Sequence, residues 1–113
     1  MSDANARWPI CLVSRFEAVD AAAFHTLVDE LRKTAASVTD EPGHVAYELL
    51  IELSTARTLY VVERWATEAD ARRHEQLVVS NGAVDRVAPL LAEPINTVTL
   101  APVPAEHEGG DPR

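Results

Sequence analysis

A tryptophan and a histidine lie nine residues apart in this sequence, and both are residue types that can carry chemistry. An imidazole with its ordinary pKa of about 6.5 can take up a proton near neutral pH, and an indole can stack on an aromatic ligand. We therefore predict Trp65 and His74 as the catalytic residues. Two simpler interpretations stay open: Trp65 as a core residue that ends a strand, and His74 as a hydrogen-bonded residue that holds a helix on a sheet.

Four more side chains are predicted to bind a substrate at the same place: Tyr47, Glu63, Ser14 and Phe24. Glu63 shares a strand face with Trp65, and an unpaired carboxylate would be costly to bury there. We therefore expect Glu63 to pair with an Arg or a His rather than to act as a base. The hydroxyl of Tyr47 either points into a cavity or packs in the core, and both roles stay open.

A strand, a tight turn and a helix are expected to position these residues. The run from 59 to 65 is rich in β-branched and aromatic residues, which is typical of a strand. Thr67 can cap a helix over 68–78, with Asp70 three residues later, as in a capping box with Asp in place of Glu or Gln. His74 falls on the apolar stripe of that helix, so we expect it to face the sheet.

Hydrophobic periodicity predicts the remaining elements. Strands are expected over Ile10–Glu17, His44–Leu53, Leu59–Trp65 and Ile95–Pro102, and helices over Ala21–Val38, Glu68–Val78 and Ala83–Ala92. Asp20 is a suitable N-cap for the first helix, and Pro89 is expected to kink the last one. This order predicts an α+β protein with a ferredoxin-like fold, in which helices cover one face of a four-stranded antiparallel sheet.

The second face of that sheet has no predicted cover. Its middle strands carry apolar residues on both faces, and leaving one face in water would forgo several kcal/mol at about 25 cal/mol per Å². A second copy of the chain, packed sheet against sheet, would bury it. We therefore predict a homodimer, a dimeric α+β barrel, with Arg64 at the contact.

Charge and composition exclude several classes of protein. The 18 acidic and 10 basic residues give a net charge of −8, which argues against a nucleic acid or an anionic membrane as partner. Cys11 is the only cysteine, so we expect no disulfide framework and no Cys-based metal site. The histidines are dispersed and the sequence contains no G-x-G phosphate loop, so neither a metal nor another cofactor is expected.

The chain is expected to be one cytoplasmic domain. It contains neither a run of about 20 apolar residues nor the n-region and h-region of a signal peptide. The domain is predicted over 9–103, between a flexible N-terminus, 1–8, and a disordered tail, 104–113.

Three runs of residues, taken in order, resemble one known family. Glu41-Pro42-Gly43 followed by Tyr47-Glu48-Leu49 is similar to an E-x-G-x-x-x-Y-E-L opening of the second strand. Glu63-Arg64-Trp65 followed by His74 resembles an E-x-W…H signature, and Pro89-Leu90-Leu91 with Glu93-Pro94 resembles the closing helix and its exit. Residues 9–103 together resemble the antibiotic biosynthesis monooxygenase (ABM) domain, which also occurs in small quinol monooxygenases.

The resemblance implies a protomer that dimerises through its sheet and holds a cavity between sheet and helices. It also implies oxidation of a quinol or polycyclic phenol by molecular oxygen, with no metal and no flavin. The aromatic substrate would lose a proton and pass an electron to oxygen, while the protein stabilises the anion and excludes water. The alternative is a non-catalytic or regulatory small-molecule-binding protein on the same fold.

The sequence departs from its relatives after the histidine. Many relatives have a Ser-Pro-x-Phe-like turn there, with its aromatic residue lining the cavity, whereas this chain has VVSNGAV over 78–84. A haem-degrading branch of the fold typically uses an Asn on the first strand, a Trp on the second helix and a His on the last helix. None of these three is present at its place here, so we disfavour that branch.

Overall fold

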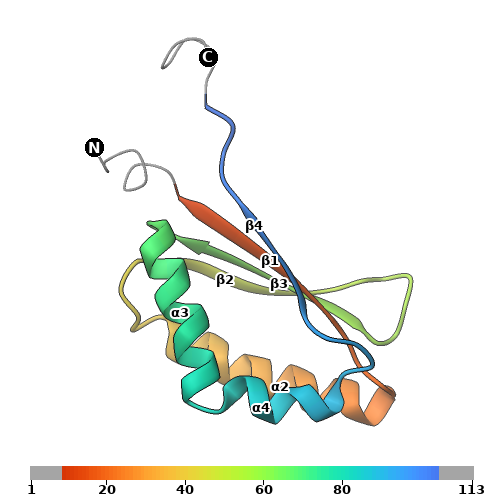
Figure 1. Ribbon diagram of the computed structural model, residues 1–113. Helices are drawn as coiled ribbons and strands as arrows, with labels where there is room; N and C mark the ends of the chain where they lie inside the picture. The colour runs from red at the N-terminus through yellow and green to blue at the C-terminus, as the bar shows by residue number, and fades with distance from the viewer. Residues whose placement is uncertain (1–8, 105–113) are drawn as a thin grey trace.

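The computed structural model describes residues 9–104, which form a four-stranded sheet and a layer of helices (Figure 1). In chain order the elements are β1 (Ile10–Glu17), α2 (Ala21–Val38), β2 (His44–Ile51), β3 (Thr58–Trp65), α3 (Glu68–Ser80), α4 (Ala83–Val87), the 3₁₀ turn η1 (Ala88–Leu90) and β4 (Asn96–Leu100). The predicted flexible N-terminus and, apart from Pro104, the predicted tail lie outside the described residues.

The first strand and the first helix have the predicted bounds. The side chain of Asp20 accepts a hydrogen bond of 2.8 Å from the N–H of Ala23, which confirms the N-cap. The apolar stripe of α2, including Leu27 and Leu31, is buried against the sheet. The short elements α4 and η1 pack on this long helix.

Two predicted strands are shorter in the structure. β2 ends at Ile51 and not at Leu53, because the chain turns there: the N–H of Thr55 donates to the carbonyl of Glu52 at 3.3 Å. β4 covers Asn96–Leu100 and not 95–102, because only these five residues pair with β1.

The helical bounds also differ from the prediction. α3 continues to Ser80, two residues past the predicted end, and stops before Gly82. The predicted helix over 83–92 is interrupted at Ala88, where a 3₁₀ turn containing Pro89 replaces it. Proline has no N–H to donate to the preceding turn, which is why the predicted break lies here.

The sheet has the strand order β2-β3-β1-β4, and every neighbouring pair is antiparallel. This is the order of the predicted ferredoxin-like fold, and all helices lie on one face of the sheet (Figure 1). Leu12 pairs with Glu63, and Ser14 pairs with Val61 on one side and Thr97 on the other. The register therefore places Ser14, Glu63 and Thr97 on the helix-covered face.

The alternation predicted for β1 and β3 is confirmed. Every second residue of β1, from Ile10 to Phe16, is buried, and so are Leu59, Val61, Glu63 and Trp65 on β3. Two apolar clusters result: one between α2 and the middle of the sheet, and a smaller one around Trp65 and Ala71. The site described below lies beside this smaller cluster.

The outer face of the sheet carries exposed apolar side chains. Leu50, Val98 and Leu100 keep 46%, 48% and 45% of their surface in contact with solvent. They share this face with Tyr60 and with Arg64, which is also exposed. Dimerisation through this face stays a prediction.

Among residues 9–104, no helix is long and apolar enough to cross a bilayer.

Candidate functional site

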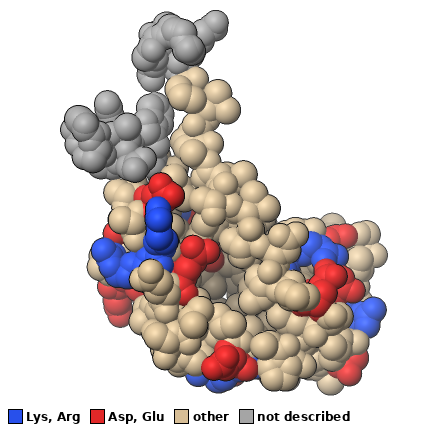
Figure 2. Space-filling view, viewed as in Figure 1, with Lys and Arg blue, Asp and Glu red and all other residues tan. Residues whose placement is uncertain are grey.

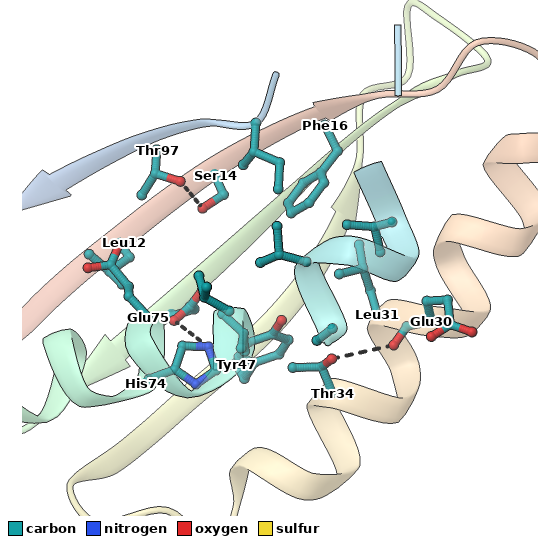
Figure 3. A pocket seen from close by; sticks show the side chains of 17 residues that line it. Leu12, Ser14, Phe16, Glu30, Leu31, Thr34, Tyr47, His74, Glu75 and Thr97 are labelled. Carbon is teal, nitrogen blue, oxygen red and sulfur yellow. Dashed lines mark hydrogen bonds and ion pairs between the residues drawn. The ribbon is translucent and has the colours of Figure 1, made fainter. Parts of the chain in front are cut away.

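A cavity of about 230 Å³ lies between the sheet and the helices, and Figure 3 shows its lining. Its walls are mainly apolar and come from β1, α2, α3, α4 and the segment before β4, with Leu12, Phe16, Leu31, Val78, Val79, Ala83, Val84, Val87 and Ile95. Its polar lining is Ser14, Glu30, Thr34, Tyr47, Glu63, His74, Glu75 and Thr97. Viewed from the side of Figure 1, charged side chains lie mostly toward the margins of the molecule, with uncharged atoms between them (Figure 2).

His74 is held on three sides. Its side chain is only 4% exposed, and its Nδ1 lies 2.9 Å from Oε1 of Glu41. Its Nε2 lies 3.6 Å from Oε1 of Glu63, and its ring stacks on the indole of Trp65 with centroids 4.9 Å apart. The imidazole is therefore fixed in orientation, with a carboxylate at each ring nitrogen.

The local sequence explains how His74 reaches this place. The hydroxyl of Thr67 accepts a 3.1 Å hydrogen bond from the N–H of Asp70 and caps α3. The carboxyl of Asp70 in turn accepts a 2.8 Å hydrogen bond from that hydroxyl. The predicted N-cap is therefore present, and the two side chains also bond to each other. His74 lies one helical turn after Asp70 on the same face, which packs on the sheet.

Glu63 is a buried carboxyl at the cavity wall. Its Oε1 accepts a 2.9 Å hydrogen bond from Nε1 of Trp65. Burial raises the pKa of Glu63, and the Trp65 hydrogen bond and the nearby His74 oppose that rise only in part. The expectation that Glu63 pairs with a His or an Arg agrees with its contact to His74. An acid with a raised pKa can exchange a proton closer to neutral pH.

Tyr47 lines the cavity from β2, and its ring meets the imidazole of His74 edge to face, with centroids 6.1 Å apart. Burial raises the pKa of Tyr47, and the negative charges of Glu63 and Glu41 add to that rise. The phenol is therefore neutral at any physiological pH, and its role at the wall is contact or hydrogen bonding rather than proton abstraction.

A second polar spot lies where β1 pairs with β4. The hydroxyls of Ser14 and Thr97 are 2.8 Å apart and form a hydrogen bond, and both residues line the cavity (Figure 3). Two hydroxyls share one hydrogen in this bond, so the second hydrogen is available to a ligand oxygen. The cavity thus has a hydroxyl pair on one side and a carboxylate–imidazole group on the other.

Two predicted site residues lie behind the cavity wall. Trp65 is 0% exposed and does not line the cavity; it contacts His74 and Glu63 from the core. Phe24 is buried among the residues that join α2 to the sheet and does not line the cavity either. Of the predicted residues, the structure brings Ser14, Tyr47, Glu63 and His74 together at one surface.

Sequence reasoning missed several residues of the site. The most important is Glu41, which lies 33 residues before His74 and reaches it from the turn between α2 and β2. Glu41 belongs to the Glu-Pro-Gly run that resembles the known family, but nothing in the neighbouring sequence indicates that its carboxylate binds a histidine on α3. Thr97 does not stand out in a short strand of threonines and apolar residues. Glu75 does not stand out on the polar face of a helix, and yet both line the cavity.

The segment 78–84 forms part of the cavity. Val78, Val79, Ala83 and Val84 line it. Asn81 and Gly82 form the bend between them, and Gly82 has φ of +87°. Small aliphatic side chains therefore shape this wall. Among residues 9–104, no group of three or more His, Cys, Asp or Glu side chains is arranged to hold a metal ion.

Solved structures share this fold. Rv0793 from Mycobacterium tuberculosis is 22% identical, with a TM-score of 0.76 over 85% of this chain and 96% of that one. A putative antibiotic biosynthesis monooxygenase from Nitrosomonas europaea is 18% identical, with a TM-score of 0.76 over 84% and 90%. PA3566 from Pseudomonas aeruginosa is 24% identical, with a TM-score of 0.70 over 88% and 98%. At these identities the similarity establishes the fold.

Sequence comparison identifies the family. None of the curated proteins compared with this chain matches it. The family model described as antibiotic biosynthesis monooxygenase matches residues 9–86, which include β1 to α3 and thus both Glu63 and His74. Because this match covers well over half of the chain, the protein belongs to the antibiotic biosynthesis monooxygenase (ABM) family.

Proposed function

We propose that this protein is a monooxygenase that oxidises a quinol or a polycyclic phenol with molecular oxygen and without a cofactor. One oxygen atom enters the substrate, and the other leaves as water with the two hydrogens that the substrate loses. The substrate itself supplies all the electrons, so no further reductant is needed. The observation that carries this proposal is the buried Glu63–His74 pair at the wall of an otherwise apolar cavity.

Proton abstraction from the substrate hydroxyl is the step assigned to this pair. Nε2 of His74 is the acceptor, directly or through the carboxyl of Glu63, whose pKa is raised by burial. The imidazolium that forms would lie between Glu41 and Glu63 and beside the substrate anion. Trp65 would act as a positioning residue, because it contacts both His74 and Glu63 and lies outside the cavity.

The apolar walls support the electron-transfer step. A phenolate or quinolate formed there lacks the water shell that would stabilise its charge, so it gives up an electron to oxygen more readily. The hydroxyls of Ser14 and Thr97 would bind a second oxygen of the substrate, because they line the cavity from β1 and β4, away from Glu63 on β3. Phe24 packs in the apolar cluster that includes Phe16, Leu31 and Val87 of the cavity wall.

The charges around the cavity favour a substrate that arrives neutral. Glu30, Glu63 and Glu75 line it, and Glu41 lies just behind. The pKa of Glu30 is lowered by hydrogen bonds from Lys33 and Arg86, so it stays ionised. An anionic substrate would be repelled, whereas a neutral quinol is charged only after its proton has passed to the pair.

The homodimer is part of the same proposal. The exposed apolar face of the sheet, with Leu50, Val98 and Leu100, would be covered by the same face of a second copy. Light scattering at micromolar concentration measures this directly. A mass twice that of the chain is expected, and a stable monomer would contradict it.

The test is oxygen consumption by chelator-treated protein with a panel of reduced quinols and anthrones. We expect uptake that is lost in His74→Gln and retained in the control His25→Gln, because His25 is an exposed histidine on α2. Tight binding of an aromatic ligand without oxygen uptake, across the panel, would instead favour the small-molecule-binding protein. Loss of uptake on chelation would contradict a reaction without metal.

A further inference from the structure

His74 has a different carboxylate at each ring nitrogen, at unequal distances. Oε1 of Glu41 lies 2.9 Å from Nδ1, which is a full hydrogen bond. Oε1 of Glu63 lies 3.6 Å from Nε2, which is longer than a hydrogen bond. An ionised carboxylate can only accept, so a neutral imidazole that bonds to Glu41 carries its one hydrogen on Nδ1.

The turn that carries Glu41 is held by backbone hydrogen bonds on both sides of Pro42. The N–H of Glu41 donates to the carbonyl of Val38 at 3.0 Å, and the N–H of His44 donates back to the carbonyl of Glu41 at 3.3 Å. Pro42 fixes one backbone angle of the turn, and Gly43 adopts a φ of +79° that other residues rarely adopt. The carboxylate of Glu41 is therefore presented from a rigid support.

The same turn is packed against the helix that carries His74. A Cβ added to Gly43 would collide with the carboxyl of Asp70, so the backbone of Gly43 lies directly against the Asp70 side chain, in a space that only a glycine leaves open. The carbonyl of Gly43 also accepts a 2.8 Å hydrogen bond from the N–H of Ala66, just before α3. Asp70 is one helical turn from His74, so this contact sets the distance between Glu41 and the imidazole.

We propose that Glu41 is the positioning residue of this site: it holds hydrogen on Nδ1 of His74 and leaves Nε2 bare toward Glu63 and the cavity. Without Glu41, the neutral imidazole could carry its hydrogen on Nε2 instead. Nε2 could then not accept the proton of the substrate. Three other groups contact the imidazole, and none of them lies at Nδ1: Glu63 is next to Nε2, Trp65 stacks on the ring, and Tyr47 meets it edge to face. Glu75, the next residue on α3, lines the cavity. The consequence for catalysis rests on the proposed function, whereas the tautomer does not.

The first measurement needs no substrate. Long-range ¹H–¹⁵N NMR correlation of the labelled protein at alkaline pH distinguishes a protonated from a bare ring nitrogen. We expect hydrogen on Nδ1 of His74 in the wild type and on Nε2 in Glu41→Leu. The matched control is Asp40→Leu, which removes the neighbouring exposed carboxylate and should leave the tautomer unchanged.

The second measurement is steady-state turnover of the best quinol. Loss of a group that orients a metal-bound histidine typically costs 10- to 100-fold in affinity or activity, and we expect a similar factor for a histidine that accepts a proton. In Glu41→Leu we expect kcat to fall by about that factor with KM within about twofold. Glu41→Gln should restore most of it, because its amide oxygen can still accept from Nδ1.

The two measurements separate the two proposals. Hydrogen on Nε2 in the wild type overturns the role of Glu41, whatever the kinetics show, and this spectrum decides even where a variant does not fold. An unchanged tautomer in a folded Glu41→Leu protein also overturns it. A wild type with hydrogen on Nδ1 and no oxygen uptake with any phenol retains the Glu41 assignment and rejects the monooxygenase.

Discussion

The imidazole of His74 and the indole of Trp65 lie nearly parallel, with ring centroids 4.9 Å apart and planes 28° apart. The same indole donates its only N–H to Glu63, at 2.9 Å. One core side chain therefore sets both the plane of the proposed base and the position of its neighbouring carboxylate. Trp65 influences the cavity without touching it, which neither a cavity wall nor a simple core residue would do.

Replacing Trp65 with Phe should lower both stability and the order of the site. The variant keeps most of the apolar volume but leaves the buried Glu63 without its donor, which costs about 1–3 kcal/mol of the free energy of unfolding. Urea denaturation measures this loss. The matched control is Tyr60→Phe, which removes the 3.1 Å bond to Glu52 at a partly exposed place and should cost less. Equal losses in both variants would contradict the role of the buried bond.

Glu63 should make stability depend on pH. Because burial raises its pKa, the folded protein binds its proton more tightly than the unfolded chain does. Stability from this group is fully present below the unfolded pKa and falls as pH rises through the folded pKa, by at most about 1.4 kcal/mol per pH unit.

The variant Glu63→Gln isolates this effect, because its amide resembles the neutral acid. Thermal or urea unfolding of both proteins from acid to neutral pH should show the wild type losing stability relative to the variant as pH rises. Parallel curves over this range would show that Glu63 has an ordinary pKa in the folded protein.

The two glycines with positive φ should respond differently to alanine. An alanine at either position would strain the backbone by about 1–2 kcal/mol, because φ is +79° at Gly43 and +87° at Gly82. At Gly43 the new Cβ also collides with the carboxyl of Asp70, whereas at Gly82 the nearest atom is Nη1 of Arg86 at 3.3 Å. Gly43→Ala should therefore unfold at clearly lower urea concentration than Gly82→Ala, and the reverse order would contradict the packing of the turn on α3.

Negative charge on the substrate should weaken binding. Glu30 is paired with Lys33 and Arg86, whereas Glu75 lines the cavity as an exposed carboxylate, so a carboxylated quinol should have a KM about tenfold above that of its neutral parent at low salt. Added salt should narrow the ratio, because it screens exposed charges, and so should Glu75→Gln. Equal KM values for the two substrates would show that the acidic lining does not select for charge.

The sequence was sufficient to predict most of the fold, because β1, α2 and the α3 cap depend on local patterns. The residues of β1 and β3 that the alternation predicts to be buried are buried, and Asp20 and Thr67 cap the predicted helices. Where the strands end is decided by pairing rather than by composition, so β2 and β4 proved shorter than their apolar runs.

The site was less accessible to prediction because its partners are far apart in sequence. Periodicity placed His74 and Glu63 toward the sheet, but it gives no information about a contact over 33 residues such as that with Glu41. Periodicity also cannot tell the wall of a cavity from the core behind it. From the sequence, Trp65 and Phe24 could each lie in the cavity wall or in the core. Only the packing of α2 and α3 shows that both lie in the core.

The pairing of the first strand with the last has a consequence for the growing chain on the ribosome. Ser14 and Thr97 meet across 83 residues, so the cavity has no wall on that side until β4 has been made. The Glu41–His74–Glu63 contacts lie within β1 to α3 and can form earlier, at a lower entropic cost of closing the loop. The Glu41–His74–Glu63 group can therefore assemble before β4 joins the sheet, and a ligand can be enclosed only after β4 has paired with β1.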